Sequence, residues 1–240
     1  MSLHVEWVGL ACFRLWTNDG SVIATDPYAP DVLGLTEPEE LALQIQADVV
    51  IASSLTDTAH SNLGLVKGNP EVINALDVAE GKHKANVNDV PVIAVPASET
   101  PDHPEGPKDC ALYAFRAGGI WVLHMGDLGY GLSNEQLAPF AGHCDLLLAL
   151  AGEGLTLPID ELDPMINFLD PSWIVPMHYN VPPVTGKLQV MSKVEVLLDQ
   201  RSQDPVVFTR DDTTEFPLDT AALGRPTIVV LEPSGYTRTG

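Results

Sequence analysis

GIWVLHMGDLGY, from Gly119 to Tyr130, lies in the middle of the 240-residue chain and decides how the rest of the sequence can be interpreted. Its apolar first part, Ile120 to Leu123, predicts a short buried strand, and the glycines that follow predict a tight turn. The turn places Asp127 where the strand ends, and glycines let the backbone come close to a small ligand there. Asp127 therefore either binds a metal ion or caps its own backbone in an Asx turn.

Other predicted strands also run into residues that can bind a metal ion or transfer a proton. These residues are Asp57 and His60 after the strand at 48–52, Glu99 and His103 after the strand at 90–96, and His178 after the strand at 173–177. The ends of separate strands can meet at one edge of a sheet, so a folded chain can gather such side chains. The sequence therefore predicts one site built from distant segments.

The remaining segments predict strands mixed with helices. A strand at 7–15 is expected to pair with one at 21–25, Thr36 begins a helix that runs to about Gln46, and Ser133 to Gln136 form a capping box. Further helices are predicted at 158–169 and at about 188–200, and further strands at 145–150, 206–208 and 227–231. This mixture favours a layered α/β fold. Without a linker or an internal repeat, residues 1–240 are expected to form a single domain.

The amino-acid composition excludes several classes of partner. Acidic residues number 33 against 12 Lys and Arg, which gives a formal net charge of -21. Such a surface repels phosphate backbones and anionic membranes, so we expect no nucleic acid and no membrane among the partners. Nor is any apolar run long enough to span a membrane. A small molecule is therefore the expected substrate or ligand.

The cysteines and the N-terminal sequence indicate the compartment. Cys12, Cys110 and Cys144 are odd in number and far apart, which is typical of small buried residues in a reducing compartment. The chain begins with an alternating strand pattern, His4 to Val8, instead of the basic and apolar regions of an export signal. The protein is therefore expected to be cytoplasmic.

The order of these segments resembles the metallo-β-lactamase superfamily, in particular its bacterial metal-dependent hydrolase branch, which includes ascorbate-phosphate lactonase-like proteins. The resemblance covers almost the whole chain and is most specific in the segments 123–129 and 175–179. It implies a four-layer αββα sandwich, with Asp127 as the metal-bridging aspartate and His178 as the last histidine ligand. Members of the family often self-associate, so a homo-oligomer is also implied as an option.

The family's main metal-binding loop is degenerate in this chain. In the family a strand is followed by His-x-His-x-Asp-His, which helps to hold two zinc ions and a hydroxide. Here Ser54 and Thr56 stand at the first two histidines, and His60 matches the last one only if one extra residue is allowed. Glu99 stands at the mid-chain histidine, with His103 four residues further on as its alternative.

Two hypotheses follow from the resemblance and from this loss. In the first, the protein hydrolyses an ester, lactone or phosphoester with one divalent ion, Zn, Mn or Fe, held by Asp127 and His178 with His60 or Glu99, and with Asp57 as general base. In the second, no metal is bound, and the protein is a pseudoenzyme that acts as a ligand-binding or assembly module. The degenerate loop disfavours two metal ions in either case.

Two further residues are expected to support the site without binding the ion. His124 lies on the strand before the turn and is expected in the core, where it holds Asp127 in place. Asp26 precedes Pro27 and is expected to form a turn or to orient a ligand. His4, His83 and His143 are expected to be ordinary surface or loop residues.

Overall fold

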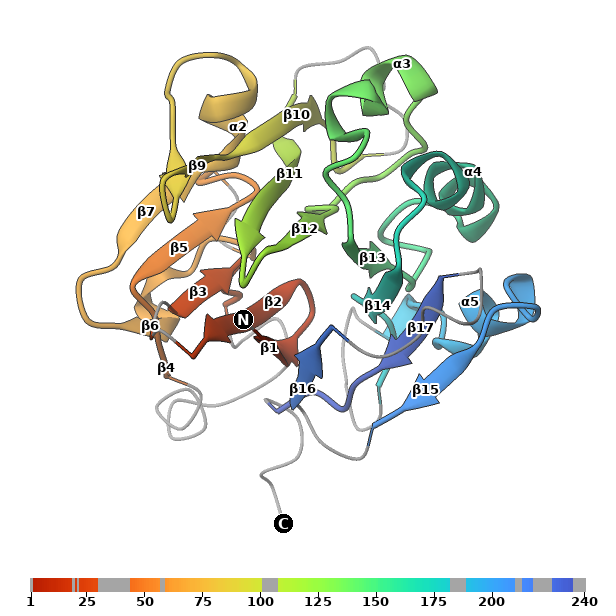
Figure 1. Cartoon of the computed structure of the whole chain (residues 1–240). Coiled ribbons are helices and arrows are strands. Elements are labelled where there is room, and N and C mark those ends of the chain that lie inside the picture. Colours follow the sequence, from red (N-terminus) through yellow and green to blue (C-terminus); the bar gives the residue numbers. More distant parts are fainter. Residues whose placement is uncertain are drawn as a thin grey trace.

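The structure, a computed structural model, is built around two β-sheets (Figure 1). It describes residues 2–18, 20, 22–29, 44–56, 59–100, 108–181, 189–209, 213–217 and 226–234. The first sheet has six strands in the spatial order β16 (Thr213–Phe216), β1 (Leu3–Gly9), β2 (Cys12–Thr17), β3 (Val22–Thr25), β5 (Val49–Ala52) and β7 (Glu71–Asn74). Neighbours from β16 to β3 are antiparallel, whereas β3, β5 and β7 are parallel.

The second sheet has seven strands. Their spatial order is β10 (Ile93–Ala97), β11 (Cys110–Ala117), β12 (Ile120–His124), β13 (Leu146–Leu150), β14 (Trp173–Met177), β17 (Thr227–Val230) and β15 (Val206–Phe208). Neighbours from β10 to β12 are antiparallel, and those from β12 to β15 are parallel. The parallel strands therefore all end at one edge of this sheet.

Short helices and two small ribbons complete the described part of the fold. The helices are α2 (Ala75–Ala79), α3 (Asn134–Leu137), α4 (Ile159–Leu169), α5 (Glu195–Gln200) and the 3-10 helices η2 (Leu63–Leu65) and η3 (Ala138–Phe140). The ribbons pair β4 (Ile45–Gln46) with β6 (Val66–Lys67) and β8 (Asn86–Val87) with β9 (Val90–Pro91). Among the described residues no helix combines the length and apolar character needed to cross a membrane.

A large apolar core joins the two sheets, and a smaller buried cluster around Val8, Tyr28 and Val50 lies apart from it. In β1, Leu3, Val5 and Trp7 are fully buried and alternate with partly exposed residues, which is the period-two pattern of a strand covered on one face. Every residue of β13 is buried, as expected for a parallel strand covered on both faces. Trp7 and β13 belong to one continuous cluster of buried apolar side chains. Burial of this cluster is the main force that holds the sheets together.

The predicted α/β class is confirmed, together with most of the predicted strands. β14 and β15 have the predicted bounds, and α4 begins one residue later than predicted. The capping box is present, because the Ser133 hydroxyl accepts from the backbone of Gln136 and the Gln136 side chain accepts from the backbone of Ser133. All three cysteines are buried and free of disulfides.

Four predicted elements differ from the structure. One is the strand at 90–96, which is divided between β9 and β10 because these two segments pair with different strands. The predicted strand at 7–15 is divided by a turn, where Leu10 adopts the left-handed backbone conformation with a φ of 48°. The predicted helix at 36–46 lies mostly outside the described residues, and its last residues form β4 because they pair with β6. The predicted helix at 188–200 begins only at Glu195, because Ser192 bonds through its backbone to Gly152 and Asn180.

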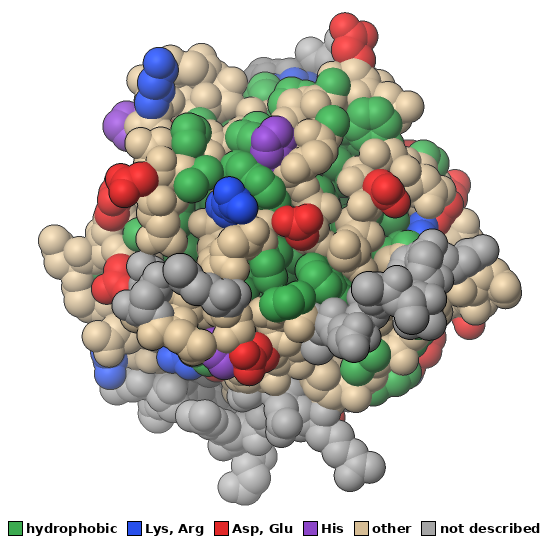
Figure 2. All heavy atoms as spheres, in the orientation of Figure 1, with side chains coloured by type: hydrophobic (Ala, Val, Ile, Leu, Met, Phe, Trp, Pro, Cys, Tyr) green, Lys and Arg blue, Asp and Glu red, His purple; other side chains and the backbone are tan. Residues whose placement is uncertain are grey.

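On the face of the molecule that Figure 2 shows, the acidic side chains do not form one block. Figure 2 shows one face of the molecule, on which acidic side chains stand apart from one another and apolar side chains reach the surface between them. This distribution fits the absence of a run of like charges in the sequence. The net charge of -21 is therefore not gathered into one patch on this face.

Arg201 is expected to stabilise the packing of α4 against α5. Its side chain is only 8% exposed and forms ion pairs with Asp163 of α4 and with Asp204. We expect Arg201→Ala to lower the free energy of unfolding by about 2 kcal/mol, because two carboxylates lose a charged hydrogen-bond donor. Urea unfolding followed by circular dichroism measures this change.

The matched control is Arg14→Ala, since Arg14 forms a more exposed ion pair with Glu6. That variant should lose less than about 1 kcal/mol, as is usual for exposed pairs. Equal losses in the two variants would contradict the stabilising role of Arg201.

Candidate metal centre

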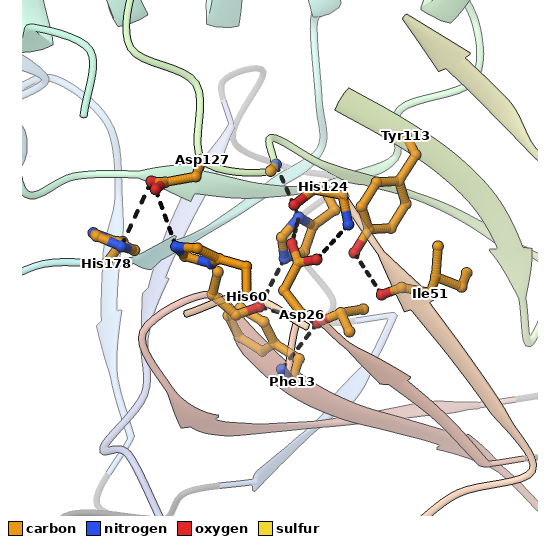
Figure 3. A network of polar contacts seen from close by, with 12 residues as sticks. Phe13, Asp26, Ile51, His60, Tyr113, His124, Asp127 and His178 are labelled. Carbon is orange, nitrogen blue, oxygen red and sulfur yellow. Dashed lines mark hydrogen bonds and ion pairs between the residues drawn. The ribbon is translucent and has the colours of Figure 1, made fainter. Parts of the chain in front are cut away.

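Three side chains from three separate loops meet, with the carboxylate of Asp127 next to the imidazoles of His60 and His178 (Figure 3). His60 follows β5, Asp127 lies three residues after the end of β12, and His178 follows β14 directly. The Nε2 atom of His60 lies 3.0 Å from Oδ2 of Asp127, and Nε2 of His178 lies 3.6 Å from Oδ1. The two imidazole rings stack at 5.6 Å between centroids. Both histidines therefore direct a ring nitrogen at the same aspartate.

The geometry of this group fits a divalent metal ion. One ligand atom from each of His60, Asp127 and His178 lies within 4.8 Å of the others, and no other described residues form such a group. Atoms that share a zinc ion at about 2 Å lie roughly 3 to 4 Å apart, so small side-chain movements would complete coordination. Two imidazoles and one carboxylate are a common set for Zn and Fe, and leave positions open for water. The residues therefore suit a single-metal site.

The electrostatic environment also favours metal binding. Burial lowers the pKa of His178, which keeps its imidazole neutral and its lone pair available. Burial alone would raise the pKa of Asp127, but His60 and His178 beside it lower the value to about 2. Asp127 is therefore ionised at neutral pH, with a negative charge in a largely enclosed position.

A buried histidine supports the turn that carries Asp127. The Nε2 atom of His124 lies 2.8 Å from the carbonyl oxygen of Ala11, so this nitrogen must carry the proton and donate it. Its other nitrogen, Nδ1, accepts the backbone N–H of Gly126 at 2.9 Å. Burial lowers the pKa of His124 to about 3, in agreement with a neutral ring. His124 thus fixes the residue next to Asp127.

Asp26 supports the loop that leads to His60. Its Oδ1 atom accepts the backbone N–H of Ser53 at 2.5 Å, and its Oδ2 atom lies 3.3 Å from Nδ1 of His124. Burial raises the pKa of Asp26 to about 7, although His60 and the Ser53 N–H oppose this shift. The lone pair of His124 Nδ1 already accepts the Gly126 N–H, so an ionised Asp26 carboxylate beside it would be repelled and the protonated form fits this contact better. Asp26 and His124 together connect the two loops that carry His60 and Asp127 (Figure 3).

His178 is held in a strained backbone conformation by close packing. Its φ is 55°, which is unusual for a residue other than glycine. A Cβ atom placed on Gly152 would lie 1.9 Å from the His178 carbonyl oxygen, so only glycine fits beneath this residue. The backbone N–H of His178 also donates to Leu10 of the first sheet at 3.2 Å. These contacts fix the direction of the His178 side chain.

The other predicted site residues have different positions. Glu99 is half-buried and is not a member of the three-residue group; its backbone N–H donates to Asp109 at 2.9 Å. Asp57 and His103 lie outside the described residues. Ser54 and Thr56, at the positions of the missing histidines, bond to each other through their hydroxyls at 2.7 Å. The side chains brought together are therefore those predicted at His60, Asp127 and His178.

The sequence analysis missed the role of Gly152 and understated that of Asp26. Gly152 follows a buried strand, which is a signal for a turn but not for close packing against a loop 26 residues away. Asp26 precedes Pro27, which suggested a local turn, yet its carboxyl bonds to Ser53. Tyr179 and Asn180, next to His178, line a cavity of about 400 Å³.

The chain belongs to the family described as the beta-lactamase superfamily domain, which it matches over residues 4–178. The structure is similar to that of a metallo-β-lactamase superfamily protein from Thermotoga maritima, with 26% identity, a TM-score of 0.65 and coverage of 95% of this chain and 98% of the other. A metallo hydrolase from Ignicoccus hospitalis is similar in fold, with 19% identity, a TM-score of 0.57 and coverage of 91% and 100%. The predicted metallo-β-lactamase fold is confirmed.

Two curated relatives are named UPF0173 metal-dependent hydrolase. The one from Pyrococcus furiosus is 26% identical over 110 residues, which are 45% of this chain and 49% of the relative. The one from Thermococcus onnurineus is 28% identical over 141 residues, which are 56% and 62% of the two chains. The chain thus spans about half to three-fifths of the length of these relatives.

We expect Gly152→Ala to displace His178. The added methyl group would collide with the His178 carbonyl oxygen, which is backbone and cannot rotate away. Such overpacking should lower the free energy of unfolding by about 2 kcal/mol and weaken binding of Zn²⁺. Thermal unfolding and competition with a chromophoric chelator measure the two effects. Gly64→Ala is the control, because there the added atom meets only the side chain of Asn62; similar effects in both variants would argue against the specific contact.

Asp26 is expected to make the stability of the metal-free protein depend on pH. Its folded pKa of about 7 exceeds the ordinary aspartate value of 3.8, so the folded state binds more protons than the unfolded state between these values, and stability falls as pH rises from about 4 to 7. The variant Asp26→Asn removes this fall in stability, and asparagine tolerates the positive φ of 33° at this position.

The stability of Asp26→Asn relative to the parent should therefore rise by up to about 1.4 kcal/mol per pH unit between pH 4 and 7, and then level off. Urea unfolding at several pH values in the presence of a chelator tests this. A stability difference that stays constant with pH would refute a raised pKa.

Proposed function

We propose that the protein is a hydrolase that uses one divalent metal ion, bound by His60, Asp127 and His178. The observation that carries the proposal is the convergence of two buried imidazole nitrogens on one ionised carboxylate, at separations of 3.0 and 3.6 Å. Buried groups of this kind are costly to assemble unless they bind a partner. The names of the two curated relatives support metal-dependent hydrolysis as the class of reaction.

The bound ion would lower the pKa of a water molecule, so that hydroxide is available at neutral pH. His60 and His178 would supply neutral nitrogen ligands, and Asp127 would supply the negative charge that balances the ion. In the overall reaction the oxygen of water bonds to the acyl carbon or phosphorus, the bond to the leaving oxygen breaks, and that oxygen takes a proton. We propose Asp57 as the general base for this proton transfer.

The donor set favours Zn or Fe, and Mn is the next candidate. A second ion is disfavoured, because Ser54 and Thr56 carry neutral hydroxyls that bond to each other. Neutral hydroxyls are weak ligands for zinc compared with imidazole. The reaction would therefore rely on one ion and on the surrounding hydrogen bonds to orient the substrate.

The second candidate function is a pseudoenzyme that binds a ligand or another protein without catalysis. The hydroxyl pair at Ser54 and Thr56 favours it, since these side chains replace two imidazoles and satisfy each other. In that case the His60, Asp127 and His178 contacts would only stabilise the loops. Metal content separates the two candidates.

We expect the protein purified without chelator or nickel resin to contain close to one equivalent of Zn, Fe or Mn by elemental mass spectrometry. Asp127→Ala should remove the ion and abolish ester hydrolysis, because it deletes the only carboxylate in the group of three. Glu99→Gln is the control and should keep both, since Glu99 lies outside that group. Metal below about a tenth of an equivalent in the parent, even after incubation with each ion, would favour the pseudoenzyme.

A further inference from the structure

We propose that the rim of the metal centre binds an aliphatic group, and hence that the substrate is a neutral ester or lactone with an aliphatic acyl chain. The inference rests on the proposed function, because it names the substrate class of the same site. We define the rim as Leu55, Leu155 and Val190, three exposed aliphatic side chains on segments that contact the loops of Asp127 and His178 or one another.

Leu55 lies on the loop between β5 and His60, and 42% of it is exposed. The hydroxyls of its two neighbours, Ser54 and Thr56, form a hydrogen bond with each other. The same loop packs against the turn that carries Asp127, because a Cβ atom on Gly126 would lie 3.1 Å from Cβ of Ser53. Leu55 is therefore exposed beside the metal-binding group.

Leu155 lies on the loop after β13, and 40% of it is exposed. Gly152 of this loop packs directly on the backbone of His178. Two residues beyond Leu155, the backbone N–H of Leu157 donates to the carbonyl of Leu128 at 2.9 Å. The loop thus touches both the residue that follows Asp127 and His178 itself.

Val190 is 63% exposed, the highest value among the exposed aliphatic residues of the described chain. A Cβ atom on Gly154 would lie 2.9 Å from the Val190 carbonyl oxygen, so the segment at 189–192 rests on the loop of Leu155. The backbone N–H of Ser192 donates to Gly152 at 2.5 Å. Val190 and Leu155 therefore belong to neighbouring segments on the same side of the site.

The charges around the site favour a neutral substrate. The described residues of these loops, 53–56, 59–62, 125–131, 151–157, 178–181 and 189–192, include no Lys or Arg. The nearby Lys108 donates to the hydroxyl of Tyr130 at 3.0 Å, and Glu153 accepts from Ser192 at 2.8 Å. Among the described residues of these loops an anionic group would find no cationic side chain, and the amino group of Lys108 is already bonded to Tyr130. An aliphatic chain, in contrast, would cover side chains that water now contacts.

The first experiment measures binding without catalysis. Protein loaded with Zn²⁺ is titrated with acetohydroxamate and with octanohydroxamate, two zinc-binding probes that differ only in chain length. Octanohydroxamate should bind at least about tenfold more tightly, because each buried methylene favours binding by about fourfold. Leu155→Ser and Val190→Ser should each reduce this preference by about threefold or more. Equal affinities, or no binding of either probe, would overturn the proposal.

The matched control is Val207→Ser, which removes a side chain of 40% exposure from the edge strand β15. This variant should keep the full preference for octanohydroxamate. If it loses the preference as Leu155→Ser does, the effect belongs to the surface in general and the proposal fails.

The second experiment compares hydrolysis of p-nitrophenyl acetate and octanoate. Leu155→Ser should raise KM for the octanoate several-fold more than KM for the acetate, whereas Val207→Ser should leave both reactions unaltered. If neither ester is hydrolysed but octanohydroxamate binds preferentially, the hydrolase proposal fails and the aliphatic site stands. If both are hydrolysed with equal kcat/KM, the hydrolase stands and the aliphatic site fails.

Discussion

The candidate site depends on two hydrogen bonds made by the neutral imidazole of His124. The imidazole donates to Ala11, in the turn between two strands of the first sheet, and accepts from Gly126, which follows a strand of the second sheet. A single buried ring therefore ties the two sheets together at the edge where the candidate metal-binding side chains lie. Tyr113 stacks on this ring at 4.8 Å between centroids, so its plane is fixed as well as its hydrogen bonds.

Asp26 extends this connection to the loop of His60. Its carboxyl faces both Ser53 and His124, and all three groups are fully buried. A buried polar group in a low dielectric is costly unless a partner satisfies it, and Oδ1 of Asp26 has such a partner in the Ser53 N–H. The contacts of Asp26 therefore couple the loop of His60 to the turn of Asp127 through the core.

Much of the fold could be predicted because the local patterns agree with the tertiary structure. The buried strands β13 and β14 are apolar throughout, and their length and flanking turns identified them. The residues of the metal-binding group were also within reach, because each follows a predicted strand. His60 stands one residue further along the chain than the last histidine of the family's His-x-His-x-Asp-His motif. It still meets Asp127, because a loop can absorb an insertion at little cost.

Other features were beyond sequence reasoning. The division of the strand at 7–15 depends on Leu10, a residue type that rarely adopts a positive φ and gives no local signal. Gly152 reads as an ordinary turn residue, and only its contact with the His178 backbone explains why no side chain fits. The sequence by itself determined most of the strands that lead into the site and the residue types that can bind an ion, but not β7, β11 or β16. Only the tertiary structure decided which of these residues meet and that Glu99 does not, because those distances depend on packing between segments far apart in the chain.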